Sequence, residues 1–303
     1  MMEIKYSGDK LGATSFSIRS SKSSPVTSSM AAEQLGVCAE KGVENGKIFT
    51  AIDDDFDGVI VEMKEAMNPM VFHSMLKASL SQWRHQGKKG VWIKLPIGLA
   101  NLVEYAVKEG FWYHHAEPTY LMLVRWIPET EHTIPANATH RVSVGAFVMN
   151  EKREVLVVQE KTGHLRSLGW KFPTGVVDEG EDICDAAIRE VKEETGIDSE
   201  FVEILAFWQT HKSLFEKSDL FFVCILRPLS FDIQIQELEI EAAAWIPLEE
   251  YATQPFVQNP EILKRLIDIY KAKVDGVYTG FSPLLTKAKI YLYFNEKGLK
   301  KMQ

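Results

Sequence analysis

One segment, residues 175–197, constrains the fold of this 303-residue chain more than any other, because it joins helix signals to a cluster of acidic side chains. Asp182 is suited to be an N-cap, and Asp185 adds negative charge to the first turn, where the helix dipole favours it. Gly196 stands where a left-handed C-cap would end the helix. The residues that recur every four positions, and so share one buried face, are Ile183, Ala187 and Val191. The segment predicts a helix over residues 182–195.

The carboxylates of this helix crowd one side. Glu190 is followed at i+3 and i+4 by Glu193 and Glu194, and such like-charge pairs cost roughly 0.2–0.5 kcal/mol each on a bare helix. Arg189 offsets only part of this repulsion, and Glu181 adds another carboxylate just before the helix. Hard oxygen ligands of this kind suit Mg²⁺ or Mn²⁺. Taken alone, however, an acidic run of this kind is usually a solvated helix face.

The spacing of the whole segment is more specific than its charge. Gly175 is followed by Glu181 after five intervening residues, and Arg189-Glu190 follows after seven more intervening residues. The run then continues as Val-Lys-Glu-Glu-Thr-Gly-Ile, which completes the pattern known as the Nudix box. Residues 140–272 therefore resemble the Nudix hydrolases, and Trp170-Lys-Phe-Pro-Thr-Gly175 resembles the family's lead-in to the box. The resemblance implies an α/β/α sandwich with a mixed sheet, in which the box forms a loop, a helix and a loop.

The resemblance also implies roles for the box residues. Family members hydrolyse a nucleoside diphosphate linked to another moiety. Glu190 and Glu194 would be the principal ligands of Mg²⁺ or Mn²⁺, and Glu193 would be a third ligand or would act through water. Arg189 would hold the glutamates by ion pairing, with Glu181 supporting it. The metal would neutralise the pyrophosphate and lower the pKa of a bound water.

Two further features of the site lie outside this helix. Gly175 would allow a tight backbone turn beside the metal, where its carbonyl could also bind. In this family a carboxylate outside the box often deprotonates the attacking water, and Glu239 is the candidate here, with Glu237 and Glu241 next. The other interpretation of these three residues is an exposed strand edge whose charges oppose aggregation.

The pattern before the box predicts a small α+β domain over residues 49–128, followed by a polar linker at 129–139. Its expected elements are a strand at 58–63, a helix at 68–83, a strand at 91–95, a helix at 99–110 and a strand at 120–126. Adjacent strand residues face opposite ways, so His114 and His115 are not expected to form one site. The stretches at 87–96 and 109–116 resemble the N-terminal domain of a plant Nudix subfamily.

The second half is expected to begin with a hairpin, in which strand 142–149 pairs with strand 154–159 across a turn at 150–153. A loop follows at 163–169. Later elements are strands at 201–210, 219–226 and 241–246 and a helix at 261–273. Residues 273–303 are expected to form a C-terminal tail, and residues 1–48 a disordered or targeting extension.

The plant subfamily is known for hydrolysis of ADP-ribose and NADH, which would yield AMP with ribose 5-phosphate or with reduced nicotinamide mononucleotide. The aromatic-and-proline stretch of dedicated NADH pyrophosphatases is missing, which favours ADP-ribose. Candidates for stacking on adenine are Phe207, Trp208 and Phe215. Candidates for reaching phosphates are Lys161, Lys171 and Lys212. Core packing for the aromatic residues and simple surface exposure for the lysines are the other interpretations.

Two other functions stay open at this stage. One is a regulatory protein that binds ADP-ribose or NADH with little turnover, although the intact Glu190 and Glu194 favour an enzyme. The other keeps the reaction and changes the substrate to coenzyme A, FAD, a sugar nucleotide, an oxidised nucleotide or capped RNA. The resemblance also suggests a homodimer.

Charge and composition bound the partners and the location. Lys and Arg number 34 and Asp and Glu 42, so the formal net charge is 34 − 42 = −8, which argues against general binding to nucleic acids or anionic membranes. No apolar run approaches the ~18 residues of a membrane span. Three scattered cysteines indicate a reducing compartment, and the cytoplasm is expected. Residues 1–30 contain nine serines, so a chloroplast or mitochondrial transit peptide is the alternative.

Overall fold

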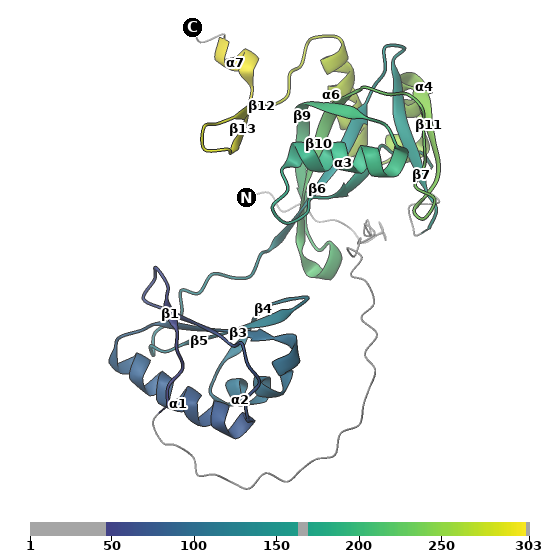
Figure 1. The fold of residues 1–303 in the computed structure, drawn as a ribbon. Helices are drawn as coiled ribbons and strands as arrows, with labels where there is room; N and C mark the ends of the chain where they lie inside the picture. The colour runs from purple at the N-terminus through teal and green to yellow at the C-terminus, as the bar shows by residue number, and fades with distance from the viewer. Residues whose placement is uncertain (1–46, 163–168, 301–303) are drawn as a thin grey trace. The chain divides into compact units, whose positions relative to one another are not determined.

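A computed structural model describes residues 47–162 and 169–300 (Figure 1). The loop expected at 163–169 and the N-terminal extension fall almost entirely outside these ranges. The described chain divides into two compact units that meet in sequence between Ala138 and Thr139. Among the described residues, no helix is long and apolar enough to cross a membrane.

The first unit is a five-stranded sheet with helices on one face (Figure 1). The strand order is β1-β2-β3-β5-β4, and only β2 and β3 are parallel. The expected helix at 99–110 is divided, because a 3₁₀ turn over Ile97–Leu102 precedes α2. The elements are β1 (Ile52–Asp53), β2 (Val59–Glu62), α1 (Pro69–His85), β3 (Gly90–Pro96), α2 (Val103–Lys108), β4 (Trp112–Glu117) and β5 (Tyr120–Trp126).

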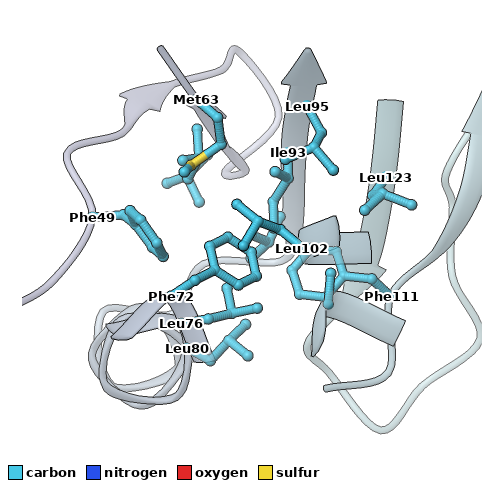
Figure 2. Close-up of a cluster of buried hydrophobic side chains, with 14 of the residues drawn as sticks. Phe49, Met63, Phe72, Leu76, Leu80, Ile93, Leu95, Leu102, Phe111 and Leu123 are labelled. Atoms are coloured by element: carbon cyan, nitrogen blue, oxygen red, sulfur yellow. The ribbon is translucent and has the colours of Figure 1, made fainter. Parts of the chain in front are cut away.

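The core of this unit lies between α1 and the sheet (Figure 2). Asn68 starts α1, since its side chain accepts a hydrogen bond from the Met70 backbone nitrogen at 2.9 Å. Apolar residues at helical spacing on α1 meet residues at alternating positions on β3, and each fully buried side chain of this size contributes about 1.5–3 kcal/mol. The residues concerned are Phe72, Leu76, Leu80, Val91, Ile93 and Leu95.

The expectation that the two adjacent histidines face opposite ways was wrong. A bulge interrupts β4, because Tyr113 pairs with Leu123 and His115 with Met122, which leaves His114 as an extra residue. A bulge cancels the alternation of side chains. The two imidazoles therefore lie together, with their Nδ1 atoms 2.7 Å apart.

The segment expected to be a linker contacts this sheet. The His114 Nε2 atom lies 2.8 Å from the Pro135 carbonyl oxygen, and the His132 ring lies 5.3 Å from that of Trp112. Both contacts are on the outer face of the sheet, because Trp92, which packs against His114, alternates with the core residues of β3. Residues 129–138 thus belong to the first unit.

The second unit is a sandwich around a mixed four-stranded sheet of order β8-β6-β10-β9, in which β6 and β10 are parallel (Figure 1). Helix α3 covers one face and the later helices cover the other, so two separate apolar cores form. The expected α/β/α fold is confirmed. The elements are β6 (His140–Val148), β7 (Glu154–Glu160), β8 (Thr174–Val176), α3 (Ile183–Thr195), β9 (Ser199–Thr210), β10 (Ser218–Pro228), β11 (Ile240–Pro247), α4 (Leu248–Thr253), α5 (Pro255–Gln258) and α6 (Glu261–Val274).

The expected hairpin between β6 and β7 was wrong. The turn forms, since the Asn150 backbone nitrogen donates to the Glu154 carbonyl at 3.0 Å, but only one bridge, Met149 to Val155, joins the strands. Beyond the bridge β7 pairs with β11. The physical reason is that β8 and β10 already occupy both edges of β6.

The residues expected to be a tail contain β12 (Ser282–Leu285), β13 (Tyr291–Phe294) and α7 (Glu296–Lys300). Phe281 ties this hairpin to β9 through two backbone hydrogen bonds with Ile204, at 2.8 and 3.0 Å. The rings of Phe281 and Tyr293 pack against the core beneath α3. The C-terminal hairpin therefore contributes to the same core as the helix that carries the carboxylates.

Candidate active site

Helix α3 forms where the sequence predicts it. Asp182 has the extended conformation of an N-cap, although its side chain makes no capping hydrogen bond. Gly196 ends the helix at φ 73°, a conformation that glycine adopts without strain. One side of α3, which includes Glu194, is buried in the core, and the partly exposed side carries Arg189, Glu190 and Glu193.

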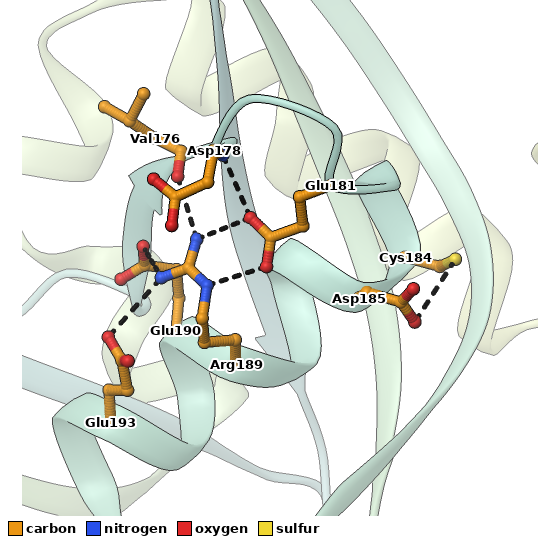
Figure 3. Close-up of polar contacts among 8 residues, drawn as sticks. All are labelled: Val176, Asp178, Glu181, Cys184, Asp185, Arg189, Glu190 and Glu193. Atoms are coloured by element: carbon orange, nitrogen blue, oxygen red, sulfur yellow. Dashed lines mark hydrogen bonds and ion pairs between the residues drawn. The ribbon is translucent and has the colours of Figure 1, made fainter.

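Arg189 organises the carboxylates on that side (Figure 3). Its guanidinium donates two hydrogen bonds to the Glu181 carboxylate, from Nε at 2.7 Å and from Nη2 at 2.8 Å. Its Nη1 atom donates to Glu190 at 2.6 Å and lies 3.4 Å from a Glu193 oxygen. Nη2 also donates to the Val176 carbonyl at 2.9 Å, which joins α3 to β8. These are the ion pairs that the resemblance implies for Arg189, and the functional roles of Arg189 and Glu181 stay a prediction.

The electrostatics of this network favour ionised groups. Burial alone would raise the pKa of Glu181, but the bonds from Arg189 and from the Asp178 backbone outweigh it and lower that pKa. Hydrogen bonds to Glu181 hold the pKa of Arg189 well above its ordinary value. Both groups therefore stay charged at neutral pH, and they fix the start of the helix to the loop before it.

Gly175 is required by a close approach. A Cβ atom at this position would lie 1.9 Å from the Glu190 side-chain carboxyl carbon. Any larger residue would displace the carboxylate, so the glycine lets the β8 backbone lie directly against it. The backbone of β8 therefore packs against the Glu190 carboxylate at Gly175.

Glu194 is the most deeply buried carboxylate of the helix. Its side chain is only 7% exposed, and its Oε2 atom is buried with no hydrogen-bond partner among the described residues. Burial raises the pKa of Glu194 to about 8, although the attraction of Lys171 and a hydrogen bond from the Thr174 backbone oppose that rise. An orphaned buried carboxylate oxygen is expensive unless it has a cation to bind.

These residues fit a hard divalent cation in their chemistry. Glu190 and Glu194 are carboxylates one helical turn apart, and the Glu194 oxygen needs a partner. Within the described ranges, no group of three or more acidic, histidine or cysteine side chains converges as a finished metal site. Figure 3 shows Glu190 and Glu193 turned towards Arg189, with which both form ion pairs.

The candidate general base lies on a loop attached to the same helix. The Gln236 backbone nitrogen donates to the Glu194 carbonyl at 3.3 Å, and the Glu239 nitrogen bonds to the Gln236 side chain at 2.8 Å. The Glu239 carbonyl also accepts from the Lys161 backbone at 2.7 Å. Glu239 is half-buried, whereas Glu237 and Glu241 are exposed.

The aromatic candidates for adenine binding do not lie in one place. Phe207 contacts Phe222 with ring centroids 5.5 Å apart, whereas Trp208 stacks on Phe221 at 4.4 Å. Phe207 and Trp208 are consecutive residues of β9, and their side chains lie on opposite faces of the sheet because side chains alternate along a strand. Phe215 is 81% exposed in the β9–β10 turn.

The lysine candidates are also dispersed. Lys212 is exposed in the β9–β10 turn, and Lys161 uses its ammonium to bond the Glu237 carbonyl at 2.8 Å. Lys171 is buried and pairs with Glu160 at 2.7 Å.

Sequence reasoning missed Glu160. The available signal was its position as the first acidic residue after the apolar run of β7.

Comparisons with known proteins identify the family of this chain. A family model described as Nudix hydrolase domain matches residues 49–127, and one described as NUDIX domain matches residues 139–266. Nudix hydrolase 2 of Arabidopsis thaliana is 59% identical over 256 residues, which cover 83% of this chain and 92% of the relative. Nudix hydrolase 10 of the same plant is 59% identical, covering 84% and 90%.

Among solved structures, the MutT protein of Methanosarcina mazei Go1 is 22% identical, covers 46% of this chain and 99% of its own, and has a TM-score of 0.39. The family assignment rests on the sequence relatives and on the box, whose glutamates, arginine and glycine are in mutual contact. The chain belongs to the Nudix hydrolase family, whose members hydrolyse pyrophosphate bonds in nucleoside diphosphate derivatives with the help of divalent metals such as Mg²⁺ or Mn²⁺.

Proposed function

We propose that this Nudix hydrolase uses Mg²⁺ or Mn²⁺ to cleave ADP-ribose into AMP and ribose 5-phosphate, with NADH as a second substrate. The observation that carries the metal-dependent reaction is the buried Glu194 oxygen without a partner, one turn from Glu190 and its contact with Gly175. The preference for ADP-ribose rests on the sequence resemblance to the plant subfamily.

In this proposal Glu190, Glu194 and the Gly175 carbonyl hold the metal, with Glu193 as a further ligand, directly or through water. The bound metal supplies charge neutralisation and a water of lowered pKa. Arg189 keeps Glu190 and Glu193 in place and does not touch the substrate. Glu239, whose loop is bonded to the end of α3, is the candidate to accept the proton of the attacking water.

Product analysis by chromatography tests the proposal. Purified full-length protein is incubated with Mg²⁺ and, separately, ADP-ribose, NADH, FAD, coenzyme A and an ADP-sugar. AMP should appear fastest from ADP-ribose, and a chelator should abolish it. Similar rates with NADH would extend the assignment to both substrates. Tight binding of ADP-ribose with no turnover of any compound would contradict the proposal and favour a regulatory binding protein.

A further inference from the structure

A second layer of charges lies behind the acidic helix. The Lys171 ammonium bonds Glu160 Oε1 at 2.7 Å and Thr174 Oγ1 at 2.8 Å, and its side chain is only 10% exposed. Backbone hydrogen bonds with Val158, at 2.7 and 3.0 Å, fix Lys171 to β7. This lysine is therefore held from three directions and is no free surface cation.

The same segment contacts Glu194 at two points. Lys171 Nζ lies 3.9 Å from Glu194 Oε1, which is an electrostatic contact beyond hydrogen-bond range. The Thr174 backbone is the second point, since its attraction opposes the rise in the pKa of the Glu194 carboxyl. Oε1 thus faces an ammonium whose own position is fixed, while Oε2 has no partner among the residues described.

We propose that Lys171, anchored by Glu160 and Thr174, is a positioning residue that orients Glu194 so that Oε2 is presented to the metal. The inference rests on the metal dependence in the proposed function. An ammonium has three donors, and Glu160 and Thr174 use two of them, which leaves a third donor on a nitrogen that lies 3.9 Å from Glu194 Oε1. Carboxylate ligands generally depend on such surrounding contacts for their orientation.

Two other roles for Lys171 predict different changes in metal affinity when the lysine is removed. If it were only a counter-charge, its removal would increase the attraction of the acidic cluster for a cation and tighten metal binding. If it contacted the substrate phosphates, its removal would raise KM and leave metal affinity unchanged. Positioning alone predicts weaker metal binding after the loss of a positive charge, so the sign of the change separates the three roles.

The experiment measures Mn²⁺ binding by electron paramagnetic resonance on the full-length chain without substrate. Lys171→Met should weaken Mn²⁺ binding at least about tenfold, the lower range for loss of such a supporting contact. At saturating Mn²⁺, turnover should recover towards the wild-type rate. Lys192→Met is the matched control, because Lys192 lies on α3 but pairs with Asp198 at 2.7 Å. Unchanged or tighter binding by Lys171→Met would overturn the inference.

Thr174→Val provides a second test that leaves every charge in place and is nearly isosteric. It removes one anchor of Lys171 and should also weaken Mn²⁺ binding, whereas an unchanged affinity would contradict positioning. Wild-type protein that binds no Mn²⁺ would overturn both the inference and the proposed function. Weakened binding in both variants, together with no hydrolysis of ADP-ribose by the wild type, would support the inference and overturn only the proposed function.

Discussion

At the scale of single residues, the site combines an arginine that satisfies its carboxylates with a glutamate that is left unsatisfied. Arg189 bonds Glu181, Glu190 and a backbone carbonyl, so these groups are stable without any ligand. Glu194 is buried and lacks a partner for one oxygen among the described residues. Evolution rarely leaves a carboxylate in this state unless function needs it, because the desolvation penalty amounts to several kcal/mol.

Glu194→Gln tests this assignment. The variant should lose turnover by several orders of magnitude, because an amide is a poorer ligand for a hard divalent cation. The metal-free variant should melt at or above the wild-type temperature at pH 9, where wild-type Glu194, with its pKa of about 8, is mostly ionised and buried. Added Mg²⁺ should raise the melting temperature of the wild type and not of the variant.

Asp185→Asn is the control for this substitution. It changes an exposed carboxylate in the first turn of the same helix and should leave both turnover and the Mg²⁺ effect intact. Comparable activity in Glu194→Gln would remove Glu194 from the metal site.

At the scale of elements, the sequence predicts what depends on local periodicity. Helix α3 and strand β5 form over the predicted residues, to within one position, because their apolar spacing and capping residues are contained within each segment. The partner of a strand, in contrast, lies outside the segment that forms the strand. The partner of β7 is β11, some eighty residues away, and nothing in either strand specifies this.

The bulge in β4 was missed for a related reason. An extra residue in one strand is defined only relative to its neighbour, here β5, so no pattern within residues 112–117 predicts it. Glu160 and Lys171 were hidden from sequence reasoning in the same way, since their pairing depends on the approach of two segments. The box was recognisable because its functional residues lie close together in the sequence.

The contacts that the bulge creates predict which ring nitrogen of each histidine, His114 and His115, carries the proton. A carbonyl only accepts hydrogen bonds, so His114 Nε2 must carry the proton that points to Pro135. In the neutral ring His114 Nδ1 is then an acceptor, and the proton between the rings belongs to His115 Nδ1. Nitrogen-15 NMR at pH 8 should show the Nε2–H form for His114 and the Nδ1–H form for His115. Exposed His85 is the reference, and a His114 in the Nδ1–H form would contradict the geometry.

At the scale of the whole molecule, the negative net charge opposes the binding of an anionic substrate that the site is proposed to bind. A chain of net charge −8 repels an anionic substrate in general, so binding depends on cations concentrated at one place. In this chain the acidic helix lies in the second unit, whose cores are separate from that of the first. The comparison with family models likewise divides the chain into two matched ranges, 49–127 and 139–266.

Because each unit has its own core, thermal unfolding should show two transitions that respond to different changes. Leu76 is fully buried in the first unit, and Leu76→Ala should destabilise that unit by about 2–5 kcal/mol through loss of packing and a cavity. Val71→Ala, at an exposed position of the same helix, should have little effect. Mg²⁺ should raise only the transition of the unit that contains α3, since binding stabilises the state that holds the ligand. Differential scanning calorimetry measures both effects, and a single transition displaced as a whole by either change would contradict the separate cores.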